Sequence, residues 1–200
     1  MRTVAVTGGI ATGKSSFCEL VCSLEPGTVI FDADQAVARL YADPGVRGEI
    51  GDAFGAPALG PDGAPDREFL RDKVFSDPAA RRQLEQILHP RVLRECLATR
   101  DRAAKSTTSP LFLADIPLFY ESGRDFGQEM VVVVAATPST QALRLRRRNG
   151  FDQPLIQAVL SAQLPIVEKI RRADLVVWNN GSLGALQRQT ARILSSLIHE

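Results

Sequence analysis

The segment that most constrains this chain is a glycine-rich loop near its start, GGIATGKS over residues 8–15. It matches the pattern of a glycine, any four residues, a second glycine, a lysine and a serine or threonine. The loop follows a β-rich run, Thr3–Thr7, and precedes a helical pattern, Gly13–Leu24. Backbone N–H groups in such a loop surround phosphate oxygens, and the positive end of the next helix faces the same anion. The sequence therefore predicts a strand–loop–helix unit that binds a nucleotide phosphate.

Two side chains of this loop have distinct expected roles. Lys14 is expected to reach the β- and γ-phosphates and to act in catalysis. The Ser15 hydroxyl is expected to ligate Mg²⁺, a hard cation that prefers oxygen donors. The full set of residues expected to bind the nucleotide here is Gly8, Gly9, Ile10, Ala11, Thr12, Gly13, Lys14, Ser15 and Ser16.

The rest of the chain alternates between buried strand patterns and helical patterns. The expected strands are Thr3–Thr7, Thr28–Phe31, Leu111–Ala114, Met130–Ala136 and Leu175–Trp178. The expected helices are Gly13–Leu24, Ala33–Tyr41, Thr137–Asn149 and Ser182–Ile198. Strands that are buried on both faces and alternate with helices are typical of a doubly wound α/β fold with a parallel sheet.

Two segments interrupt this alternation within what we expect to be a single domain over residues 1–200. A helical substrate-binding insertion is expected at about 43–109, opening with a Pro/Gly-rich stretch through Pro65. A second helical stretch, at about 141–172, carries an arginine cluster and a break at Gly150, and we expect it to form a lid. The core then comprises about 1–42, 110–140 and 173–200.

An acidic pair, Asp32 and Asp34, follows the second expected strand. In an extended segment residues i and i+2 point to the same side, so both carboxylates are expected to face the phosphate loop. A carboxylate at the carboxyl end of a strand can accept the proton of an attacking hydroxyl. Asp34 is our candidate general base and Asp32 a supporting catalytic residue. Asp32 as a simple helix cap remains the alternative.

Charge and composition exclude several classes of function. The formal net charge is +1, so no global field attracts nucleic acid, and the arginine cluster lacks interleaved aromatic residues. No run approaches the ~20 apolar residues of a membrane span, and the first residues lack the pattern of a signal peptide. We expect a cytoplasmic protein that is a monomer or weak homo-oligomer and contacts neither membrane nor nucleic acid.

The three cysteines are an odd number, and Cys18 and Cys22 share one helical face. This spacing favours reduced thiols over a disulfide framework. A metal site at the pair is the less favoured alternative, because neither histidine is near them in the sequence.

Several segments together resemble the dephospho-CoA kinase family, which has a P-loop kinase fold. The resemblance covers nearly the whole chain. It is carried by TGGIATGKS at 7–15, FDADQAVARL at 31–40, LEQILHPRV at 84–92, DIPLFYE at 115–121 and ADLVVWNNG at 173–181. Gln163, Pro165 and Lys169 also resemble the family's helix after the lid.

The resemblance implies transfer of the ATP γ-phosphoryl group to the ribose 3′-hydroxyl of dephospho-CoA, the last step of coenzyme A synthesis. ATP and dephospho-CoA are then the substrates and Mg²⁺ the metal. Arg144 and Arg148, four residues apart on one helical face, are expected to bind ATP, with Arg144 also catalytic. Asn179 is expected to read adenine. The residues expected near the acceptor are Asp34, Arg67, His89, Asp115, Leu118 and Tyr120.

Two positions depart from the family pattern. Ala11 stands where a third glycine is usual, and it would perturb the loop if that position needs a positive φ. Trp178 stands where aspartate is common.

Two alternatives to this activity remain. One is a nucleotide-dependent switch or regulatory NTPase, whose guanine-reading NKxD pattern is absent from the sequence. The other is a kinase of a different small acceptor, such as a nucleoside monophosphate. The segments around His89, Asp115 and Asn179 argue against that second alternative.

Overall fold

The structure is a computed structural model that describes residues 1–105 and 110–199. Ser109 and Glu200, where the predicted insertion and core end, lie outside the described residues. The chain forms two compact units, one made of residues 1–32 and 97–200 and the other of residues 33–96. The helical unit thus begins and ends earlier in the chain than the predicted insertion at about 43–109.

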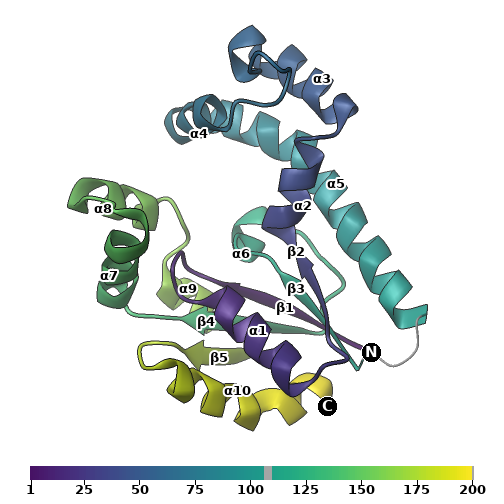
Figure 1. Cartoon of the computed structure of the whole chain (residues 1–200), viewed down its shortest axis with the longest axis vertical. Coiled ribbons are helices and arrows are strands. Elements are labelled where there is room, and N and C mark those ends of the chain that lie inside the picture. The colour runs from purple at the N-terminus through teal and green to yellow at the C-terminus, as the bar shows by residue number, and fades with distance from the viewer. Residues whose placement is uncertain (106–109, 200) are drawn as a thin grey trace. The chain divides into compact units, whose positions relative to one another are not determined.

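The first unit is built on a parallel sheet of five strands (Figure 1). The strands are β1 (Arg2–Gly8), β2 (Val29–Asp32), β3 (Leu111–Asp115), β4 (Met130–Ala135) and β5 (Leu175–Trp178). Their order is β2-β3-β1-β4-β5, and every neighbouring pair is parallel. The predicted α/β fold and all five predicted strands are confirmed.

Six helices of the described chain belong wholly to this unit. They are α1 (Lys14–Leu24), α6 (Phe119–Ser122), α7 (Pro138–Asn149), α8 (Gln153–Ser161), α9 (Ile166–Arg171) and α10 (Leu183–Ile198). Side chains cap three of them, because Thr137, Asp152 and Ser182 each accept a backbone N–H of the first turn. Gly150, with φ of 67°, ends α7 and confirms the predicted break.

The main core lies between the sheet and the pair α1 and α10, which pack side by side on one face (Figure 1). Alternate residues of the strands point to this face, because side chains alternate along a strand. The fully buried members include Val4, Val6, Phe17, Val21, Leu111, Leu113, Val132, Val134 and Leu197. On the other face α9 packs against β4.

The second unit is helical and has its own apolar core. It contains α2 (Ala33–Leu40), α3 (Pro44–Phe54), the 3₁₀ turn η1 (Ala56–Ala58), α4 (Arg67–Ser76) and the first part of α5 (Pro78–Lys105). Val46, Ile50, Ala58, Leu70, Leu84, Ile87 and Leu88 form the core. Helix α3 was not among the predicted elements; Asp43 caps it and Pro44 starts it, so proline here initiates a helix rather than marking a loop.

Cys18 and Cys96 are buried, Cys22 is half-buried, and all three are reduced thiols. In the described part of the chain, no helix combines the length and apolar character that crossing a membrane requires.

Candidate active site

The phosphate loop connects β1 to α1, and its glycines meet strict steric limits. A Cβ on Gly8 would lie 2.3 Å from the carbonyl oxygen of Val134 on the neighbouring strand. Gly13 has φ of 94°, and a Cβ there would lie 2.2 Å from Nδ2 of Asn179. Both positions therefore require glycine. The Thr12 hydroxyl donates to the Gly9 carbonyl at 2.9 Å and closes the turn.

Ala11, the departure from the family pattern, does adopt the left-handed conformation, with φ of 58°. Among the described residues it is the one non-glycine residue with a positive φ. A Cβ in this region crowds the backbone, at about 1–2 kcal/mol per residue. The loop thus keeps the conformation that glycine would favour and carries strain at this alanine.

Two predicted ATP-binding residues, Arg144 and Asn179, hold the carbonyl side of the loop. The Arg144 guanidinium donates to the carbonyls of Ala11 and Thr12, both at 3.1 Å, and to the carbonyl of Asn179 at 2.7 Å. The buried Asn179 amide donates to the same Thr12 carbonyl at 2.8 Å. These hydrogen bonds fix the Ala11 and Thr12 carbonyls and, with them, the backbone of this half of the loop. In this structure both side chains therefore contact the loop itself.

A cavity of about 450 Å³ adjoins the loop within the first unit. It is lined by Ala11, Gly13, Ser16, Arg144, Arg147, Arg148, Asn179, Gly181, Leu183 and Leu186. Arg148, which we expect to bind ATP, lies here, and the neighbouring Arg147 lines the cavity too. Planar guanidinium groups and leucine side chains suit the flat faces of a nucleobase.

Two carboxylates end adjacent strands at the same edge of the sheet. Asp32 and Asp115 are the last residues of β2 and β3 and are register partners. Asp115 is buried and Asp32 half-buried. Burial raises the pKa of the Cys18 thiol on α1, and the charges of Asp115 and Asp32 add to this increase while Lys14 opposes it. These groups therefore share one electrostatic environment at the base of the loop.

Asp34 lies in the first turn of α2. The prediction that Asp32 and Asp34 share an extended segment is wrong, because β2 ends at Asp32 and the helix begins at Ala33. Asp34 is exposed and belongs to the second unit, whereas Asp32 ends a strand of the first. The positive end of a helix favours a carboxylate in its first turn.

The other residues that we expect near the acceptor substrate lie partly in the first unit and partly in the second. In the second unit the Arg67 guanidinium lies 5.3 Å from the centre of the Tyr41 ring, and His89 is a half-buried residue of α5. In the first unit Leu118 precedes α6 and Tyr120 lies within it. Arg172 lies 5.8 Å from the centre of the Tyr120 ring, and burial raises the pKa of that phenol.

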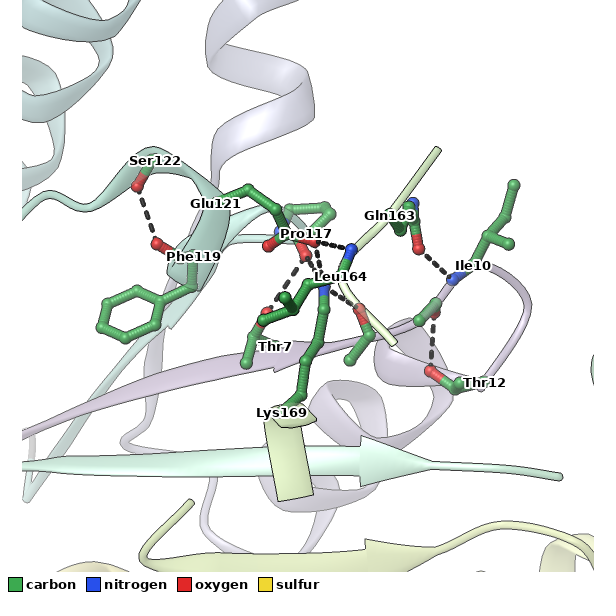
Figure 2. Close-up of polar contacts among 12 residues, drawn as sticks. Thr7, Ile10, Thr12, Pro117, Phe119, Glu121, Ser122, Gln163, Leu164 and Lys169 are labelled. Carbon is green, nitrogen blue, oxygen red and sulfur yellow. Dashed lines mark hydrogen bonds and ion pairs between the residues drawn. The ribbon is translucent and has the colours of Figure 1, made fainter. Parts of the chain in front are cut away.

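A buried polar group next to the loop had no role predicted from the sequence. The Lys169 ammonium pairs with the Glu121 carboxylate at 2.8 Å, and Gln163 contacts the loop at Ile10 (Figure 2). The Glu121 side chain is only 11% exposed. The short apolar run around Lys169 was the one available signal of burial.

Comparison with known proteins agrees with the α/β fold. The sequence profile of the dephospho-CoA kinase family matches residues 2–185. The dephospho-CoA kinase of Anaeromyxobacter dehalogenans is 45% identical, over 98% of this chain and 92% of that protein. The crystal structure of TT1252 from Thermus thermophilus is 31% identical with a TM-score of 0.83, covering 99% of this chain and 98% of that one.

A dephospho-CoA kinase from Campylobacter jejuni, 23% identical, shares the fold with a TM-score of 0.62, covering 98% of this chain and 97% of that one. The profile match spans most of the sequence, and the relative from Anaeromyxobacter dehalogenans aligns over nearly all of it. This chain belongs to the dephospho-CoA kinase family.

Proposed function

We propose that the enzyme transfers the γ-phosphoryl group of ATP to the ribose 3′-hydroxyl of dephospho-CoA, with its own phosphate loop and the adjoining cavity holding the nucleotide. The observation that carries this proposal is the loop between β1 and α1, whose Ala11 and Thr12 carbonyls accept hydrogen bonds from Arg144 and Asn179 beside a 450 Å³ cavity. Family membership supports the choice of acceptor.

In this proposal adenine and ribose occupy the cavity beside the loop. Arg147 and Arg148 offer planar cations to the base, and Leu183 and Leu186 offer apolar contacts. The triphosphate extends along the loop N–H groups towards Lys14, whose ammonium neutralises charge on the β- and γ-phosphates. The loop therefore positions the phosphoryl group, which is the larger part of catalysis in this class of reaction.

The residues at the base of the loop fit Mg²⁺. Ser15 lies in the first turn of α1, and the carboxylates of Asp32 and Asp115 end neighbouring strands. The described residues hold no group of three or more acidic, histidine or cysteine side chains that would enclose a metal. Mg²⁺ suits this arrangement because it usually keeps waters and phosphate oxygens among its ligands. When bound, it would neutralise charge on the β- and γ-phosphate oxygens.

Asp34 is our candidate for the group that accepts the acceptor's proton. The ribose oxygen forms a bond to the γ-phosphorus, and the bond from that phosphorus to the β–γ bridging oxygen breaks. The hydroxyl proton moves to the Asp34 carboxylate, and ADP leaves. The transition state is loose and spreads charge over the phosphoryl oxygens, so the base adds to positioning rather than replacing it.

The direct test is ADP release by the purified chain with ATP and Mg²⁺, comparing dephospho-CoA, AMP, adenosine and no acceptor. We expect turnover only with dephospho-CoA. Asp34→Ala should lower kcat by about 10²–10⁴-fold, the usual contribution of a general base, with KM for ATP little changed. Asp43→Ala, which removes a helix cap in the same unit, is the control. ADP release at the same rate with and without an acceptor would instead indicate a nucleotide-dependent switch or regulatory NTPase.

A further inference from the structure

Lys169 of α9 has no exposed side-chain surface, which is rare for lysine. Its ammonium lies 2.8 Å from Oε1 of Glu121 on α6. The same ammonium is 3.1 Å from the Gly8 carbonyl and 3.2 Å from the Pro117 carbonyl (Figure 2). An ammonium has three donors, and these three acceptors use all of them. Lys169 therefore joins the first glycine of the phosphate loop to the segment after β3.

The residues just before Lys169 hold the same part of the loop. Oε1 of Gln163 accepts the Ile10 N–H at 2.9 Å, and Oε1 of Glu121 accepts the Leu164 N–H at 3.0 Å. Nε2 of Gln141 donates to the Ile10 carbonyl at 2.7 Å. Both backbone polar groups of Ile10 are thus fixed by glutamine side chains. Figure 2 shows Gln163 next to Ile10, and the Lys169 ammonium next to Glu121 and Pro117.

Thr7, which precedes Gly8, contacts the same carbonyl of Pro117 as Lys169. The Thr7 hydroxyl, at the end of β1, donates to the same Pro117 carbonyl as Lys169, at 3.1 Å. Thr7 has no exposed surface. The strand end, the loop and the segment after β3 are therefore held together at one buried point.

Stability alone does not account for a buried ion pair at this position. Burial lowers the pKa of the Lys169 ammonium, and its hydrogen bond and charge interaction with Glu121 oppose that change. Buried ion pairs contribute little more to stability than apolar side chains of similar volume, and often less. What an apolar pair cannot supply is the set of donors and acceptors that hold the Gly8 carbonyl and the Leu164 N–H.

We propose that Lys169, Glu121 and Gln163 are positioning residues for phosphoryl transfer, which fix the first half of the phosphate loop from behind in its phosphate-binding conformation. The inference rests on the proposed function, because it concerns the same nucleotide site. It adds a second support to the loop: Arg144 and Asn179 hold residues 11 and 12, and these three residues hold residues 8 and 10.

The test measures nucleotide binding and stability separately. Lys169→Met leaves Glu121 buried without its partner, so this variant should lose both stability and affinity. Lys169→Met combined with Glu121→Gln removes both charges and keeps an acceptor for the Leu164 N–H. We expect the double variant to regain most of the lost melting temperature. It should still bind Mg²⁺-ADP about tenfold more weakly than the original chain in calorimetry without acceptor.

Steady-state kinetics supply the second readout. In the double variant KM for ATP should rise about tenfold, while KM for dephospho-CoA stays within about twofold. Gln163→Leu removes the acceptor for the Ile10 N–H, leaves the ion pair intact, and should weaken ADP binding by several-fold. Glu168→Gln with Arg171→Met, an exposed pair on the same helix, is the matched control and should change neither quantity.

A double variant that binds ADP as tightly as the original chain would overturn the inference and leave Lys169 a structural residue. The same holds for Gln163→Leu if its affinity is unchanged. Failure of the proposed function is distinguishable, because the unaltered chain would then fail to bind Mg²⁺-ADP or to require dephospho-CoA for turnover.

Discussion

The strained Ala11 offers the clearest prediction for a single residue. Ala11→Gly should raise the free energy of unfolding by about 0.5–1 kcal/mol, since relief of the left-handed strain exceeds the entropy cost of glycine. Urea denaturation measures the change. Ala191→Gly, at an exposed position inside α10, is the control and should lower the same free energy by about 1 kcal/mol. An equal decrease in the free energy of unfolding in both variants would show that Ala11 is not strained.

Cys18 gives a prediction of pH dependence. Its pKa is raised well above the ordinary value of about 9, chiefly by burial. At a pH between the ordinary pKa, which applies to the unfolded chain, and the higher pKa of the folded chain, the folded chain retains a proton that the unfolded chain has lost. This thiol's contribution to stability therefore falls as pH rises above 9.

Denaturation of the original chain and of Cys18→Val at pH 8 and pH 10 tests this sign. The original chain should lose about 1 kcal/mol relative to the variant over that interval. Other groups that titrate there affect both chains equally. A difference between the two chains that is independent of pH would show that the thiol ionises equally well when folded.

At the residue scale the phosphate loop was predictable because its chemistry is local in the sequence. Spacing alone identified Gly8, Gly13 and Lys14. The contacts of Lys169 and Gln163 with the loop were not predictable, because they join residues more than 150 positions apart. Lysine is usually exposed, so its type gives no signal of burial here.

Among the elements, the strands and the helices between them followed from apolar runs and helical periodicity. Helix α3 did not, because its sequence, PGVRGEIGDAF, contains three glycines and a proline that favour turns. Tertiary packing of Val46 and Ile50 in the helical unit's core stabilises α3 against this preference. The prediction that Asp34 lies in an extended segment was wrong because α2 begins directly at the end of β2.

The predicted lid over 141–172 is attached to the loop near both of its ends. Gln141 and Arg144 hold it on one side, and Gln163 and Lys169 on the other. Between them α8 is mostly exposed, with Ile156 as its one fully buried residue. We therefore expect motion to be confined to the end of α7 and to α8.

Hydrogen–deuterium exchange tests this expectation. Amides of α8 should exchange at least about tenfold faster than those of residues 164–170, because local opening there breaks fewer buried contacts. Addition of Mg²⁺-ADP should slow exchange at the end of α7, where Arg147 and Arg148 line the cavity. Equal exchange in α8 and α9 would show that the whole segment moves together.

For the whole molecule, the sequence predicted one α/β domain with a helical insertion, and the chain forms an α/β unit and a helical unit with separate cores. The class of fold could be predicted from the sequence because alternating strands and helices after a phosphate loop permit few topologies. The boundary of the helical unit was harder to predict, because α2 follows the last residue of β2 directly and no turn residues mark the change.

The proposed reaction forms coenzyme A by phosphorylation of one hydroxyl of dephospho-CoA. Mass spectrometry of the acceptor, after turnover with ATP carrying ¹⁸O in its γ-phosphoryl group, tests it most directly. We expect one labelled phosphoryl group per acceptor, with fragmentation that places it on the ribose 3′-oxygen. Label found only in free phosphate, or on AMP supplied as a competitor, would contradict it.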